Sequence, residues 1–71
     1  MKEAAAAKFG KVIRNLRKER NWTQYDLAAE MDVDAAFISR IERGRKVPSL
    51  ETILRLAQAL KVQVLFGDKK L

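Results

Sequence analysis

Residues 23–44 read TQYDLAAEMDVDAAFISRIERG, a stretch that predicts two short helices separated by a tight turn. Thr23 is a favourable N-cap, and Asp26 stands three residues later, where its carboxylate can bond back to the cap. Asp34 can cap the second helix, and Gly44 suits the left-handed residue that ends it. Two capped helices joined by three or four residues make a helix-turn-helix.

The packing of these two helices also depends on particular residue types. Ala28 occupies the position that would face Ile38 where the helices cross, and a steep crossing tolerates only a small side chain at its closest contact. Val33 would fill the angle between the helices. Asp32 stands in the turn, where a left-handed backbone is required that Asp tolerates better than most residues.

Helical patterns flank this stretch on both sides. A first helix is expected from about Lys2 or Ala4 to Arg20, because apolar residues recur along one face. A fourth helix is expected after Pro48, which blocks continuation of the third, with Ser49 as its N-cap. The buried face of this fourth helix is expected to comprise Ile53, Leu54, Leu56, Ala57 and Leu60.

The segment after the fourth helix has two interpretations. Val62, Val64 and Phe66 alternate with Gln63 and Leu65, which fits a short strand. A short fifth helix is the alternative. Residues 67–71 are expected to form a frayed tail, as chain ends commonly do.

The composition predicts one globular domain spanning residues 1–71, with 48% hydrophobic and 34% charged residues. The chain contains no Cys and no His, which excludes disulfides, thiolate chemistry, imidazole bases and nearly all zinc sites. We therefore expect no metal, no cofactor and no enzyme activity. No apolar stretch approaches the roughly 20 residues that span a bilayer, so no membrane partner is expected.

The charge balance is basic, with 15 Lys and Arg against 9 Asp and Glu and a net charge of +6. Such a balance favours a polyanionic partner, and the alternative is a solubilising surface charge. The distribution favours the first interpretation. Residues 24–34 hold four acids and no base, whereas basic residues gather at the end of the third helix and in the loop after it.

Five short motifs lie in order along the chain: IRxLR at 13–17, WTQxxLA at 22–28, ISRIERG at 38–44, PSLET at 48–52 and LAxAL at 56–60. Together they resemble the Cro and phage-repressor-like helix-turn-helix family, often called the XRE family. The resemblance covers about residues 9–62. It implies an all-α, lambda-repressor-like domain of four to five helices, with or without a short C-terminal strand.

The resemblance implies a dimeric transcription regulator, a repressor, that binds double-stranded DNA sequence-specifically with helix 35–43 in the major groove. The positions of this helix that would meet base edges are Ala35, Ala36, Ser39 and Arg40. Arg40 can read O6 and N7 of guanine, and a phosphate or surface role is its alternative. The two alanines offer only apolar contact, so specificity would also depend on DNA shape.

A further set of residues is implied to bind DNA phosphates. Gln24 resembles the family glutamine that binds a phosphate with the help of a helix N-terminus. The set comprises Gln24, Tyr25, Arg43, Arg45 and Lys46, with Lys8, Lys11 and Lys18 as weaker candidates. A solvated basic loop is the alternative for the residues that follow the third helix.

Four residues are assigned structural roles. Arg17 and Glu42 resemble a family pair that links the first and third helices by a partly buried salt bridge. Thr23 serves as the cap and Ala28 as the small residue at the helix crossing. Removing one member of the ion pair would leave a buried charge without its partner, which is costly.

The dimer surface of the family is commonly built from its last helices, which here indicates Leu60, Val62, Val64, Leu65 and Phe66. The alternative is that these side chains cap the core of a single chain. The chain accordingly divides into a core at about residues 9–62 and a dimerisation segment and tail at 63–71. A terminal strand would allow two copies to pair edge to edge.

The two interpretations of the terminal segment indicate different subtypes. A strand resembles the antitoxin members of the family, which would add a toxin protein as partner, whereas a fifth helix suits phage-type repressors or restriction-modification controller proteins. The expected partners are otherwise a palindromic operator and a second copy of the chain. The expected location is the bacterial or phage cytoplasm, associated with the nucleoid. A module that binds only proteins is the alternative from another functional class.

Overall fold

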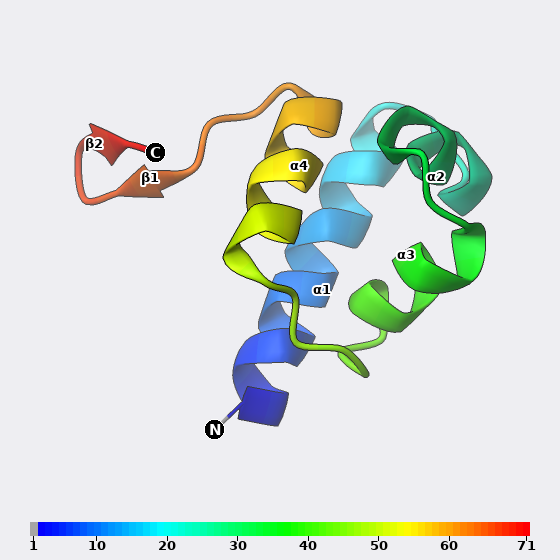
Figure 1. Ribbon diagram of the computed structural model, residues 1–71, viewed down its shortest axis with the longest axis horizontal. Coiled ribbons are helices and arrows are strands. Elements are labelled where there is room, and N and C mark those ends of the chain that lie inside the picture. Colours follow the sequence, from blue (N-terminus) through cyan, green and yellow to red (C-terminus); the bar gives the residue numbers. More distant parts are fainter. Residues whose placement is uncertain (1) are drawn as a thin grey trace.

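The computed structural model describes residues 2–71, which form four helices followed by a short hairpin (Figure 1). The elements are α1 (Lys2–Glu19), α2 (Gln24–Met31), α3 (Ala35–Glu42), α4 (Leu50–Leu60), β1 (Leu65–Phe66) and β2 (Lys69–Lys70). Figure 1 shows α1 and α4 side by side, with α2 and α3 on one flank and the hairpin on the opposite flank. No helix within residues 2–71 is long and apolar enough to cross a membrane.

The predicted caps of α2 and α3 are present. The backbone N–H of Thr23 donates to Asp26 Oδ2 at 2.8 Å, and the N–H of Asp26 donates to Thr23 Oγ1 at 3.1 Å. Asp34 Oδ1 accepts from the N–H of Phe37 at 2.8 Å. Asp32 adopts the left-handed conformation, with φ 57° and ψ 45°, and so turns the chain between the two helices. These local bonds satisfy backbone groups that helix ends leave unpaired.

The core is assembled from all four helices. Ile13 of α1 and Ala28 of α2 are almost fully buried in it, and Val33 in the turn packs against it. The side chains with no exposed surface are Leu27, Ile38, Ile41, Leu56 and Leu60. Each large apolar side chain buried in this way stabilises the fold by about 1.5–3 kcal/mol. The core therefore holds α2 and α3 at their mutual angle.

Gly10 lies where the backbone of α1 meets the end of α3. A Cβ atom at this position would be 2.4 Å from the carbonyl oxygen of Ile41 and 2.6 Å from that of Glu42. Gly44, with φ 71°, is also tightly placed, since a Cβ there would be 2.8 Å from the Cα of Ala7. The left-handed Gly44 was predicted, whereas the close approach at Gly10 was not.

The terminal segment corrects the sequence analysis. The expected short C-terminal strand is present but is confined to Leu65–Phe66, which pairs antiparallel with Lys69–Lys70, and the alternative of a fifth helix is wrong. The prediction of a frayed tail at 67–71 is therefore wrong. Gly67, with φ 68°, is the first residue of the two-residue turn, and glycine is the residue that favours this position.

The structure corrects the predicted position of one side chain of α4 and decides between two predicted positions for another. Leu54, expected on the buried face, is 38% exposed. Leu60 was expected both on the buried face of this helix and at a dimer surface; it has no exposed area and belongs to the core of the single chain, so the first expectation is confirmed and the second is wrong. The helix ends at Lys61, which adopts a left-handed conformation and directs the following segment away from the helix axis.

Candidate nucleic-acid interface

The inner face of α3 places Ile38 and Ile41 in the core, and its outer face is directed toward solvent. Ala36 and Arg40 are exposed, and Ser39 is partly exposed. Ala35 is partly buried and packs against the core, so it offers less surface than Ala36. The four predicted base-reading residues therefore share one short helix, with unequal accessibility.

A buried ion pair joins α1 to the end of α3. Arg17 Nε donates to Glu42 Oε2 at 2.6 Å, and Arg17 Nη2 donates to Glu42 Oε1 at 3.0 Å. The two side chains retain only 9% and 3% of their surface. This two-pronged geometry is the strong form of an arginine–carboxylate contact. The salt bridge expected from the family pattern is thus present.

Gln24 belongs to the same network, which the sequence analysis did not anticipate. Its side-chain amide donates to Glu42 Oε1 at 3.1 Å, while Arg17 Nη1 donates to the carbonyl of Trp22 at 2.7 Å. Glu42 therefore ties together the end of α1, the start of α2 and the end of α3. One amide hydrogen of Gln24 is engaged in this bond, and the partly exposed side chain has a second hydrogen.

The network changes the acidity of its members. Burial by itself would raise the pKa of Glu42, but hydrogen bonds from Arg17 and Gln24 and the positive charges of Arg17 and Arg14 together hold that pKa below its ordinary value. The hydrogen bond to Glu42 raises the pKa of Arg17, against the opposing effect of burial. Both groups are consequently charged at neutral pH, and the pair is locked in its ionic form.

The loop after α3 carries exposed positive charges. Arg43 caps the helix, and Gly44 turns the chain so that the N–H of Arg45 donates to the carbonyl of Arg40 at 2.9 Å. Arg43, Arg45 and Lys46 are all exposed beside α3. The fold thus brings the basic residues of the loop, which are predicted to bind phosphate, next to Arg40, which is predicted to read a DNA base.

One of these loop cations has a partner on α3. The ammonium nitrogen of Lys46 lies 5.5 Å from the centroid of the Phe37 ring. Phe37 is partly buried and packs against the core with the rest of its side chain. This contact between helix and loop was not predicted, since sequence spacing does not reveal which way the loop returns.

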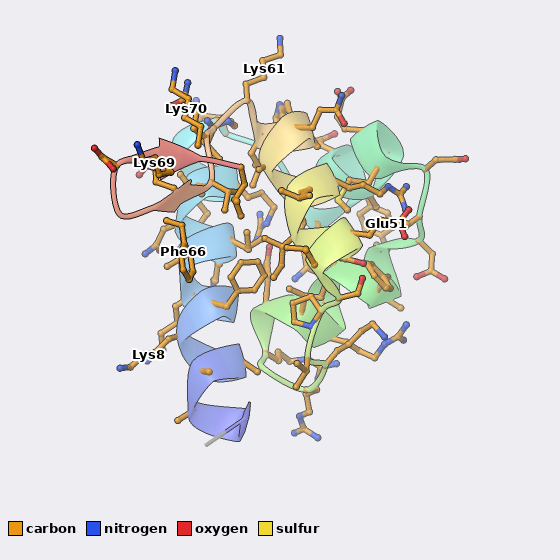
Figure 2. The ribbon with its side chains drawn as sticks, turned by 60° about the vertical axis from the view of Figure 1, so that its left-hand side comes forward. Lys8, Glu51, Lys61, Phe66, Lys69 and Lys70 are labelled. Atoms are coloured by element: carbon orange, nitrogen blue, oxygen red, sulfur yellow. The ribbon has the colours of Figure 1, made fainter. Side chains whose placement is uncertain are left out.

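The other predicted phosphate-binding residues lie on different elements. Tyr25, in the first turn of α2, is 77% exposed. The three weaker candidates, Lys8, Lys11 and Lys18, are exposed along α1. Figure 2 shows Lys8 projecting outward from the lower half of α1.

The predicted dimer residues also separate into two groups. Leu60 is in the core, and Val62 packs against it from the edge. Leu65 and Phe66 of β1 are 54% and 79% exposed, and Val64 lines an apolar groove between α4 and the hairpin. Figure 2 shows Phe66 extending from the hairpin, below the outward-pointing Lys69 and Lys70.

Comparison with protein families identifies this arrangement of helices. A family model described as helix-turn-helix matches residues 13–66. The chain belongs to this helix-turn-helix family. The resemblance inferred from the five motifs is thereby confirmed, and so is the lambda-repressor-like arrangement of its helices.

Relatives within the helix-turn-helix family are named as regulators. The HTH-type transcriptional repressor RghR of Bacillus subtilis is 51% identical over 55 residues, which cover 76% of this chain but 41% of RghR. The chain thus spans about two fifths of the length of this curated relative. The restriction-modification controller protein C.AhdI of Aeromonas hydrophila is 37% identical, with a TM-score of 0.81, covering 84% of this chain and 91% of that one.

A structure of a helix-turn-helix relative also contains nucleic acid. A single-residue variant of the controller protein C.Esp1396I, solved bound to its highest-affinity operator site, is 33% identical with a TM-score of 0.74. The match covers 80% of this chain and 75% of that one. The family consists of transcription regulators, which are not enzymes, and membership in it assigns this chain to the same class.

Proposed function

We propose that this helix-turn-helix chain is a dimeric transcription repressor that binds double-stranded DNA sequence-specifically, with α3 in the major groove. The observation that carries the proposal is the exposed outer face of α3, flanked by the basic loop and held by the Arg17–Glu42 pair. An α-helix fits the major groove, where each base pair presents a distinct pattern of donors and acceptors. The relative that is bound to an operator site supports binding to specific DNA.

Base recognition is assigned to the outward positions of α3. Arg40 is long enough to bond O6 and N7 of a guanine, and Ser39 can bond a neighbouring base edge. Ala36 is exposed and presents a methyl group to a thymine methyl. Ala35 contributes mainly by allowing close approach, because part of its surface is already covered by the core.

Phosphate binding is assigned to both ends of the helix-turn-helix. Arg43, Arg45 and Lys46 supply positive charge on one side of α3. Gln24 and Tyr25 stand at the N-terminus of α2, where free backbone N–H groups attract an anion. Glu42 holds the Gln24 side chain through one amide hydrogen, which leaves the second for a phosphate oxygen.

The dimer surface is assigned to the exposed part of the terminal segment. Val62, Val64, Leu65 and Phe66 are retained from the sequence analysis, and Leu54 joins them beside the groove. Leu60 is left out because it is buried within one chain. A dimer would present two recognition helices to half-sites about one helical turn apart, which a single copy cannot read.

Selection of bound sequences from a random DNA pool tests the proposal. We expect an enriched palindrome whose two halves lie about one helical turn apart. Binding to it should weaken steeply as salt rises, because counterions are released from the DNA. Recovery of no enriched sequence, with binding only to proteins, would instead favour the interpretation as a protein-interaction module.

The similarity to C.AhdI favours restriction-modification control, since the match covers 91% of that protein, whereas the lack of a fifth helix within residues 2–71 counts against this subtype. Such a protein would control restriction and modification genes, and we expect them to flank its own. The antitoxin alternative rests on the terminal strand and requires a neighbouring toxin gene. Sequencing the flanking genes separates the two, and binding of the selected operator upstream of those genes completes the test.

A further inference from the structure

Phe37 occupies an unusual position on α3, between the core and the basic loop. It lies in the first turn of the helix, where its N–H is bound by the Asp34 cap. Part of its side chain packs against the core, which fixes the ring. The accessible part of the ring lies near the ammonium group of Lys46, at 5.5 Å from centroid to nitrogen. The ring is therefore a fixed surface beside a long, flexible cation.

The backbone explains how a loop residue reaches the first turn of α3. Gly44 adopts φ 71°, and its N–H donates to the carbonyl of Ile41 at 3.0 Å. This hydrogen bond and the left-handed backbone of Gly44 reverse the chain at the end of the helix. The side chain of Lys46 consequently extends back along α3 toward its N-terminal half, where Phe37 is placed.

The Phe37 ring is the one partner of the Lys46 ammonium group among the described side chains. Among the side chains that the structure describes, the one ion pair is Arg17–Glu42, so Lys46 is held by an aromatic face and not by a carboxylate. A cation over an aromatic face is attracted by the ring quadrupole. This attraction restricts the motion of the Lys46 side chain and leaves its positive charge available. A carboxylate partner would offset that charge, which is needed to bind a phosphate.

We infer that Phe37 is a positioning residue for DNA binding, which holds Lys46 beside α3 so that its ammonium group can bind a backbone phosphate. This inference rests on the proposed function. A lysine that is already restricted loses less freedom when it binds, so the contact is strengthened without any bond between Phe37 and DNA. Arg45, exposed in the same loop, provides the matched comparison because no ring contact holds it.

The first experiment examines the free protein by NMR. The protons next to the Lys46 ammonium should be shifted upfield by the Phe37 ring, and the shift should vanish in Phe37→Leu and persist in Phe37→Tyr. Thermal melting of each variant verifies that it is folded. Lysine protons at ordinary positions in the unmodified protein would overturn the inference, whether or not the protein binds DNA.

The second experiment is a double-mutant cycle on a mixed-sequence DNA duplex at low salt. Phe37→Leu should weaken binding about two- to five-fold, and in the Lys46→Ala background it should have no further effect. Lys46→Ala and Phe37→Leu should each reduce the salt dependence, whereas Phe37→Tyr should preserve it. In the Arg45→Ala background the full effect of Phe37→Leu should remain.

The outcomes separate this inference from the proposed function. Additive effects of Phe37→Leu and Lys46→Ala, in a protein that binds DNA, would overturn the positioning role and leave the proposed function intact. Absence of DNA binding by the unmodified protein would overturn both, even if the NMR contact were present.

Discussion

Arg17 and Glu42, 25 residues apart in the chain, form two hydrogen bonds of 2.6 and 3.0 Å at a contact between α1 and α3 where both side chains are almost fully buried. The same carboxylate accepts a bond from Gln24 at the start of α2. One buried acid therefore links the three helices that form the proposed DNA-binding surface. Several of the predictions below depend on this arrangement.

Arg17→Met should lower the free energy of unfolding by about 3–5 kcal/mol, because it leaves Glu42 buried without its partner. Urea denaturation measures this loss. The double variant Arg17→Met with Glu42→Leu should recover much of it, since it leaves no unpaired buried charge. A double variant no more stable than Arg17→Met alone would contradict this account of the pair.

The stability of the protein should fall in acid partly through Glu42. Its pKa is lower in the folded chain than the ordinary value of 4.5, so its contribution is fully present above that value and is lost as the pH falls through the depressed pKa. Urea denaturation between neutral pH and acid should show this loss. Glu42→Gln should remove this component, so the difference in stability between the two proteins should shrink as the pH is lowered. A constant difference would count against the ionic state assigned to Glu42.

Gly10→Ala should be destabilising by about 1–3 kcal/mol, because its Cβ would overlap the carbonyl oxygen of Ile41. Helix propensity alone predicts the opposite sign, a gain of about 1 kcal/mol. Lys11→Ala, at the exposed neighbouring position, should change stability by only about 0.5 kcal/mol or less. Thermal or urea denaturation of the two variants decides the matter, and a stabilising Gly10→Ala would exclude the close approach.

Arg40→Ala should reduce affinity for the selected operator by about 1–3 kcal/mol and relax the preference at one base position in each half-site. Lys46→Ala should instead weaken binding to all sequences alike. Binding to a set of singly substituted operators distinguishes the two. Identical profiles for the two variants would show that the assignment of base and phosphate roles is incorrect.

Phe66→Ser should shift the protein from dimer to monomer at micromolar concentration and should lower the melting temperature only by the stability that association contributes, because the side chain is 79% exposed in the single chain. Leu60→Ala is the contrasting variant and should lower stability by about 2–5 kcal/mol, since Leu60 fills the core. Sedimentation equilibrium and thermal melting provide the two readouts. A Phe66→Ser protein that remains dimeric would remove the hairpin from the dimer surface.

Local signals made much of the fold predictable. The caps at Thr23 and Asp34, the left-handed Asp32 and the terminal Gly44 depend on bonds between residues a few positions apart, and all four are present. The hairpin was missed although Gly67 and Asp68 form a recognisable two-residue turn. Its strands are only two residues long, so the alternating pattern that identifies a strand had little length in which to appear.

The sequence by itself determined the four helices, their ends and the family to which the chain belongs, because these follow from short-range bonds and apolar spacing. Only the tertiary structure decided that Gly10 touches the end of α3, that Leu54 is exposed and that Lys46 rests over Phe37. It also decided that Gln24 shares Glu42 with Arg17. These contacts join residues brought together by the packing of separate helices and by the path of a loop. Their geometry is set by the whole core, and no local pattern encodes it.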